Sequence, residues 1–302
     1  MCDVQRWIEN HTSSGLLSWV DQQTAAKRFG VSVACIEAIC LKRGILPARY
    51  QRNGAMLSCR DQLCLFSSHV AVVGCGGLGG YVVEELARLG VGHLTIIDPD
   101  VFEEHNLNRQ IFSSTEVLGC DKVAIAAQRL AEVNPAVVVT PRVKAFSADN
   151  GIGLLAGAQV VVDALDNITT RLELADVCQE LEVPLVHGAI GGWYGHVTTL
   201  MPEQRHLERI YPATDARGIE RKLGNPSFTP AIIASLQVAE VSKLLLDRGS
   251  TLHDRLLMVD LLDHHRRSGG HDGDARQVLF VLRLRHRQAV DVVAAPGKQP
   301  HH

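Results

Sequence analysis

Residues 69–80, HVAVVGCGGLGG, join a short apolar run to a cluster of glycines, and the rest of the chain is organised around them. The run at 70–73 is β-rich, and a helical pattern of apolar residues follows the glycines. A G-x-G-x-x-G match indicates a nucleotide site when it forms the turn between a strand and a helix. Gly74, Gly76 and Gly79 occupy the three glycine positions of that motif.

Glycine suits this turn because it adopts dihedral angles closed to other residues and leaves room for a phosphate beside the backbone. The helix after the turn presents free N–H groups and a positive dipole end to such a phosphate. Asp98 follows nineteen residues after Gly79, at the end of the apolar run 94–97, where an acid commonly binds a ribose hydroxyl. The pattern therefore predicts a nucleotide-binding site.

The composition is typical of a globular protein with a sizeable core, since 46% of the 302 residues are hydrophobic and 21% are charged. A net charge of −3 gives no electrostatic reason to expect nucleic acid or an anionic membrane as the main partner. No apolar run approaches eighteen residues and the N-terminus lacks a signal-peptide pattern, so no membrane span and no export are expected. The eight cysteines include no C-x-x-C pair, which indicates reduced thiols and a cytoplasmic location.

Apolar runs that alternate with helical patterns predict an α/β fold. We expect a doubly wound, Rossmann-like, mainly parallel sheet with antiparallel C-terminal strands. The expected strands are 70–73, 94–97, 136–143, 159–165, 183–190, 191–201, 256–262 and 278–285, and the expected helices include 122–132, 169–182 and 229–249. Asp121 is the expected N-cap of the helix at 122–132.

The first 48 residues form a small N-terminal helical segment in this prediction. Residues 22–44 resemble a helix-turn-helix in which Ser32 caps the second helix. The surplus of basic residues is too small for the phosphate contacts of DNA binding, so we expect an appendage that packs on the main domain. The nucleotide-binding domain is expected at 49–265, and a C-terminal strand and tail at 266–302.

Two cations follow the predicted ribose-binding acid. A nicotinamide enzyme has only a pyrophosphate to neutralise, whereas Arg109 and Lys122 suit a triphosphate through charge-assisted bonds of about 1.5–3 kcal/mol each. Asp166 follows a buried strand at the sheet edge where ligands bind, and a carboxylate there can hold Mg²⁺ together with substrate phosphates. Asn167 beside it is a candidate N-cap of the next helix.

Several short motifs recur in one order along some two hundred residues. They are R-Y-x-R at 49–52, G-x-G-G-L-G at 74–79, D-x-D at 98–100, N-L-x-R-Q at 106–110, G-x-x-K at 119–122, N-P at 134–135 and D-N-x-x-x-R at 166–171. With these motifs the chain resembles the ThiF/MoeB/HesA adenylyltransferase family. That family includes the adenylation domain of ubiquitin-activating enzymes and the activating proteins of molybdopterin and thiamine biosynthesis.

The resemblance implies a site for ATP and Mg²⁺. Asp98 would bind the ribose, Asn106, Arg109 and Lys122 the phosphates, and Asp166 the Mg²⁺. In this family the counterpart of Arg52 reaches the ATP of the other subunit, so a homodimer is implied. The expected catalytic residues are Arg52, Arg109, Lys122 and Asp166, and the expected nucleotide-binding residues are Gly74, Gly76, Gly77, Gly79, Asp98, Asp100, Asn106, Arg109, Gln110, Lys122 and Asn167.

The resemblance also implies the reaction. The C-terminal glycine carboxylate of a ubiquitin-like sulfur-carrier protein ending in Gly-Gly would attack the α-phosphate of ATP and release pyrophosphate. Such a carboxylate has a pKa of about 3.3–3.7, so it is ionised at pH 7 and needs no general base. We further expect that the missing side chain of Gly77 lets this glycine tail approach the α-phosphate.

Two departures from the family pattern concern cysteine. Many relatives bind zinc through two C-x-x-C pairs in the C-terminal half, where this chain has no cysteine, so no zinc is expected. Residues 202–227 also lack the cysteine with which some relatives form a thioester or persulfide. We therefore expect the reaction to stop at the acyl-adenylate.

Other functions stay open at this point. Within the same fold, the substrate could be a small carboxylate or the threonylcarbamoyl group of a tRNA, although the near-neutral charge disfavours nucleic acid. A nicotinamide-dependent oxidoreductase would use the glycine turn and Asp98 but gives no role to Arg52, Arg109 and Lys122. A nucleotide-sensing regulator would use the helix-turn-helix.

Overall fold

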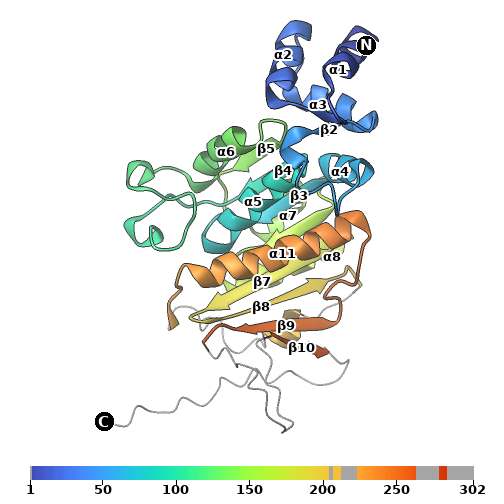
Figure 1. Ribbon diagram of the computed structural model, residues 1–302. Coiled ribbons are helices and arrows are strands. Elements are labelled where there is room, and N and C mark those ends of the chain that lie inside the picture. The colour runs from blue at the N-terminus through green and yellow to red at the C-terminus, as the bar shows by residue number, and fades with distance from the viewer. Residues whose placement is uncertain (1, 204–206, 212–222, 263–278, 284–302) are drawn as a thin grey trace, which may run out of the picture.

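A computed structural model describes residues 2–203, 207–211, 223–262 and 279–283, and its centre is one eight-stranded sheet (Figure 1). The strand order is β10-β9-β8-β7-β6-β3-β4-β5, which runs from the bottom to the top of Figure 1. Strands β3 to β7 are parallel, and β8, β9 and β10 are antiparallel to their neighbours. This arrangement confirms the predicted fold class. The bounds are β3 His69–Val73, β4 His93–Ile97, β5 Val138–Arg142, β6 Val160–Asp163, β7 Leu185–Gly191, β8 Tyr194–Leu200, β9 Arg255–Asp260 and β10 Leu279–Arg283.

Helices cover both faces of the sheet because the central strands are apolar on both sides. Val70 and Val72 of β3 belong to one hydrophobic core, and Ala71 and Val73 belong to the other, as the two-residue period of a strand requires. Figure 1 shows α5 and α11 across the near face, with α8 behind the sheet. The helices of this domain are α4 Cys59–Phe66, α5 Gly77–Leu89, α6 Lys122–Val133, α7 Ala148–Leu155, α8 Ile168–Glu180, α9 Leu207–Ile210 and α11 Phe228–Leu246, with the short 3-10 turns η1 Ala48–Tyr50, η2 Glu104–Asn106 and η3 Thr115–Val117.

Helix α11 is long and apolar enough to cross a membrane by length and composition alone. Its buried polar side chains nevertheless bind the sheet. Gln237 Nε2 donates to the carbonyl oxygen of Asp163 at 2.8 Å, and Glu240 Oε2 accepts from Thr199 Oγ1 at 2.7 Å and from the Leu252 amide at 2.6 Å. These bonds identify α11 as a core helix of the domain.

The N-terminal segment has its own small core and a helix-turn-helix-like arrangement. Its elements are α1 Cys2–His11, β1 Leu16–Leu17, α2 Trp19–Phe29, α3 Val33–Lys42 and β2 Leu46–Pro47. Ser32 caps α3 by accepting from the Cys35 amide at 3.1 Å, which confirms that prediction. A buried network docks the segment on the main domain: Arg49 donates to Glu37 at 2.5 Å and to Asn134 at 2.8 Å, and Tyr50 donates to Glu37 at 2.7 Å.

Some local predictions differ from the structure. Asp121 precedes α6 but its side chain makes no capping bond, so the expected N-cap interaction is wrong. The strand expected at 159–165 ends at Asp163, and the strand expected at 191–201 begins only at Tyr194, after a turn. Apart from β10, the segment 266–302 lies outside the described residues, and the domain boundaries at 48 and 265 stay predictions.

Candidate nucleotide-binding site

A cleft of about 260 Å³ lies along the carboxyl ends of the parallel strands. Ligands of open α/β sheets bind at this edge. The cleft brings ten of the predicted site residues together: Gly74, Gly76, Gly77, Asp98, Asp100, Arg109, Gln110, Lys122, Asp166 and Asn167. Their convergence from the ends of β3, β4 and β6 makes this cleft the candidate site.

The glycine turn at its floor depends on the absence of side chains at two positions. Gly74 has φ +96°, and a Cβ there would lie 2.5 Å from the carbonyl oxygen of Ala164. A Cβ on Gly79 would lie 1.9 Å from the carbonyl oxygen of Gly74, so Gly79 lets α5 pack directly on the turn. Gly76 is the N-cap residue of α5, which directs the free amides of the first helical turn toward the cleft.

Asp98 follows β4 directly and fixes the glycine turn. Its carboxylate accepts the amide of Cys75 at 2.6 Å and the amide of Asp100 at 2.8 Å. Burial raises the pKa of Asp98, while the nearby Lys122 ammonium and these two amides oppose the shift. A carboxylate has about four acceptor positions, so two remain for a ribose.

Two cations line the cleft. Lys122 begins α6 and is buried, with its ammonium 3.0 Å from Asp100 Oδ2. Arg109 donates through Nη1 to the carbonyl oxygen of His105 at 3.0 Å and to Asn108 Oδ1 at 2.8 Å. Both side chains are therefore held in place before any anion binds.

Asp166 and Asn167 reach the cleft from the loop after β6. Asn167 accepts the Thr170 amide at 3.2 Å, which confirms its predicted role as N-cap of α8. Among the described residues, Asp166 makes no hydrogen bond and no ion pair, and it is exposed. Its two oxygens are thus free to bind a cation.

The ThiF family profile matches residues 50–271. The SAMP-activating enzyme E1 of Haloferax volcanii is 40% identical over 220 residues, which cover 71% of this chain and 82% of that protein. This chain belongs to the ThiF family. Another relative, the molybdopterin-synthase adenylyltransferase of Salmonella typhimurium, is 34% identical over 206 residues and covers 67% of this chain and 82% of its own length.

The ThiF assignment agrees with the fold. The crystal structure of the E. coli tRNA N6-threonylcarbamoyladenosine dehydratase TcdA in complex with ATP superposes with a TM-score of 0.57 at 23% identity, over 66% of this chain and 94% of that one. At that identity the likeness shows a common fold. Relatives named adenylyltransferase and sulfurtransferase MOCS3 are longer, and this chain spans about half of them.

Three predicted residues of this ThiF-family chain do not line the cleft. Gly79 instead lets α5 pack against the glycine turn. Asn106 is buried in η2, where its Oδ1 accepts the Glu103 amide at 3.0 Å. Arg52 is exposed in the turn that follows η1 and is not a lining residue of the cleft. The phosphate contacts expected of Asn106 and Arg52 stay predictions.

Lys144 and Asn225 are among the lining residues that were not predicted from the sequence. Lys144 lies two residues after β5. Its place just beyond the carboxyl end of a parallel strand could have identified it from the sequence. Asn225 lies in the segment before α11, which has no periodic pattern. Only the three-dimensional structure brings Asn225 to the cleft.

A separate polar cluster lies beneath the loop that carries Asp166. Asp163 Oδ2 lies 2.6 Å from His187 Nδ1 and 3.6 Å from Arg171 Nε. His187 Nε2 lies 3.2 Å from His196 Nε2, and both rings contact Tyr211. Burial is the main reason that the pKa values of both histidines are lowered. Arg171 also donates to the carbonyl oxygen of Leu165, so this cluster supports the wall of the cleft.

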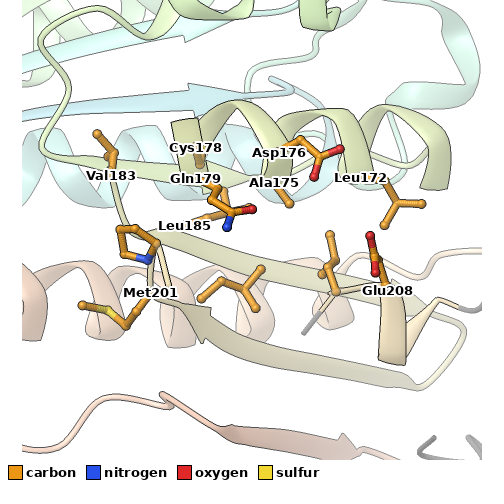
Figure 2. A pocket seen from close by; sticks show the side chains of 12 residues that line it. Leu172, Ala175, Asp176, Cys178, Gln179, Val183, Leu185, Met201 and Glu208 are labelled. Carbon is orange, nitrogen blue, oxygen red and sulfur yellow. The ribbon is translucent and has the colours of Figure 1, made fainter. Parts of the chain in front are cut away.

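A second, much smaller cavity of about 30 Å³ lies between α8 and the strands β7 and β8 (Figure 2). Figure 2 shows Leu172, Ala175 and Gln179 on the α8 side of the cavity and Met201 and Glu208 on the opposite side. None of the predicted site residues lines this cavity. Its small size and mostly apolar lining indicate a packing gap of the core.

Proposed function

We propose that this ThiF-family chain is an adenylyltransferase that activates the C-terminal glycine of a small ubiquitin-like sulfur-carrier protein. The observation that supports this most directly is the convergence of Asp98, Arg109, Lys122 and Asp166 on the glycine turn. The names of the relatives, a SAMP-activating enzyme and a molybdopterin-synthase adenylyltransferase, support the same reaction class.

ATP is the proposed nucleotide substrate. The amides of the first turn of α5 and the Arg109 and Lys122 side chains offer donors to a triphosphate. Asp98 keeps acceptor positions for the ribose hydroxyls. Gln110 Oε1 is buried at the cleft without a hydrogen-bond donor among the described residues, which fits a site completed by a bound ligand.

Mg²⁺ is the proposed metal cofactor. The free Asp166 carboxylate fits the oxygen ligands that Mg²⁺ prefers. When bound, Mg²⁺ would neutralise charge on the transferring phosphates. We expect no zinc, because the sequence after Cys178 contains no cysteine. Metal analysis of the purified protein checks this, and stoichiometric zinc would contradict it.

The reaction needs positioning more than acid–base chemistry. A carboxylate oxygen of the carrier attacks the α-phosphorus of ATP, a new P–O bond forms, and the bond to pyrophosphate breaks. Arg109 and Lys122 stabilise the charge that moves onto the leaving pyrophosphate. We place Arg52 at the nucleotide of a second subunit, which makes a homodimer the active form, and we place the enzyme in the cytoplasm.

ATP–pyrophosphate exchange tests the proposal. We expect exchange only when a small carrier protein ending in Gly-Gly is present. Exchange with small carboxylates, or with a threonylcarbamoyl-modified tRNA, would assign the substrate to those alternatives. Tight NAD binding without exchange would favour an oxidoreductase. Specific operator binding by the full chain would favour a regulator.

A further inference from the structure

The cleft is longer than a phosphate site requires. Its lining residues come from the ends of five adjacent strands, in the order β5, β4, β3, β6, β7. Four strand spacings of about 4.8 Å give a length of about 19 Å. Lys144 and Phe146 lie at the β5 end, whereas Ile190 and Asn225 lie at the β7 end.

The two ends differ in what they can bind. With phosphates at the α5 N-terminus and the ribose at Asp98 on β4, the nucleotide base extends toward β5. The β7 end then lies on the opposite side of the phosphates from the base. It is therefore the part of the cleft that the nucleotide leaves open.

Asn225 presents an unused acceptor at this open end. Its Oδ1 is buried, and no donor bonds to it among the described residues. A buried acceptor without a partner is rare and unfavourable. Gln110 Oε1 is in the same state, but Gln110 packs beside Gly76, in the phosphate part of the cleft.

The backbone around Asn225 is held firmly while its side chain stays free. The carbonyl oxygen of Asn225 accepts from Asn108 Nδ2 at 3.1 Å, which ties this segment to the loop that carries Arg109. The carbonyl oxygen of Gly224 accepts the Gly192 amide at 2.7 Å, beside the end of β7. Such fixing lowers the entropy lost when the side chain binds a ligand.

We propose that Asn225 Oδ1 accepts a backbone N–H of the glycine tail of the carrier protein. Phosphate groups offer only acceptors, so an acceptor at the β7 end matches a donor-bearing ligand, and a peptide backbone carries one N–H per residue. Glycine residues fit the approach past Gly77, which is bounded by Pro230 and Arg109. This inference rests on the proposed function and adds a residue that binds the glycine tail of the carrier.

The first test compares Asn225→Ala with a matched control, Ser227→Ala, in the full chain. Ser227 lies in the same segment, is exposed, and makes no side-chain capping bond. Exchange is measured against the concentration of the Gly-Gly carrier and, separately, of ATP. We expect Asn225→Ala to raise the half-saturating carrier concentration about five- to tenfold, as loss of one hydrogen bond predicts, and to leave that of ATP within about twofold.

Thermal unfolding separates this role from a structural one. Since Oδ1 has no partner in the free protein, its removal should leave Tm unchanged or higher. The Asn108 bond to the backbone survives in Asn225→Ala, because it uses the carbonyl oxygen. A lower Tm, a changed ATP requirement, or an unchanged carrier requirement would each overturn the proposal.

The second test removes the donor from the carrier. Semisynthetic carriers with N-methylglycine at the last or the penultimate position lack one N–H each. One of them should lose affinity for the wild-type enzyme and show no further loss with Asn225→Ala. If the affinity losses of both carriers instead add to the loss caused by Asn225→Ala, the role of Asn225 is refuted. Exchange with the unmodified carrier would still support the proposed function. No exchange with any carrier in the wild type would refute both.

Discussion

Replacing Gly77 by alanine separates the functional from the structural need for glycine in the turn. A Cβ on Gly77 would lie 3.6 Å from Pro230 Cβ and 3.8 Å from Arg109 Cδ, which is ordinary van der Waals contact. The backbone of Gly77 also lies outside the left-handed region. A Cβ on Gly79 would instead lie 1.9 Å from the Gly74 carbonyl oxygen. Gly77→Ala should therefore fold, whereas Gly79→Ala should be strongly destabilised.

The expected stability change for Gly77→Ala is small and favourable. Alanine is preferred over glycine within helices by about 0.5–1 kcal/mol, and Gly77 is the first residue of α5. A gain of about 0.5 kcal/mol raises Tm by about 1–2 °C in a chain of this size. Gly153→Ala in α7 is the matched control, because a Cβ there meets nothing within 4 Å and Gly153 does not line the cleft.

The activity of Gly77→Ala should move in the opposite direction. If the carrier tail passes over Gly77, an added methyl group displaces the attacking carboxylate by about the width of a bond, which can lower the rate about 10²-fold. ATP–pyrophosphate exchange with a Gly-Gly carrier measures the effect, with Gly153→Ala expected at the wild-type rate. Full exchange by Gly77→Ala would refute the close approach of the tail at this position.

Three further predictions concern charge. Lys122→Ala should lower exchange about 10²-fold, as expected for loss of one preorganised donor, and circular dichroism should show that the fold persists. A heterodimer of one Arg52→Ala subunit and one Asp166→Ala subunit should recover part of the activity that each homodimer lacks, and no recovery in verified heterodimers would count against Arg52 acting in trans. The lowered pKa values of His187 and His196 mean that the unfolded chain binds more protons below about pH 6.5. The free energy of unfolding should thus decrease as the pH is lowered below about 6.5, by up to about 1.4 kcal/mol per pH unit for each histidine. Urea titrations at several pH values should show a weaker dependence of this free energy on pH for His196→Gln.

The sequence was sufficient for the parts of the fold and the site that follow from local pattern. Apolar runs located β3 to β7, and the glycine spacing located the turn before α5. Asp98 was predictable because it directly follows such a run, and Lys122 because it begins a helix with an apolar stripe. In each case the residues that determine the local structure are adjacent in the sequence.

Contacts between distant segments could not be predicted in this way. Arg49, for example, bonds Glu37 and Asn134, which are 12 and 85 residues away. Asn225 reaches the cleft only because the segment before α11 lies against the Arg109 loop.

The docking of the N-terminal helices bears on the choice between an enzyme and a DNA-binding regulator. In a helix-turn-helix, α3 would be the helix that enters the major groove. Here α3 buries Ile36, Glu37, Cys40 and Leu41, and Lys42 is its one exposed charged residue. Binding to a phosphate backbone depends on several cations. The Glu37 carboxylate instead anchors Arg49, three residues before Arg52. This contact argues that the segment is a rigid support for the R-Y-x-R turn, which is what an arginine that acts on a second subunit would need.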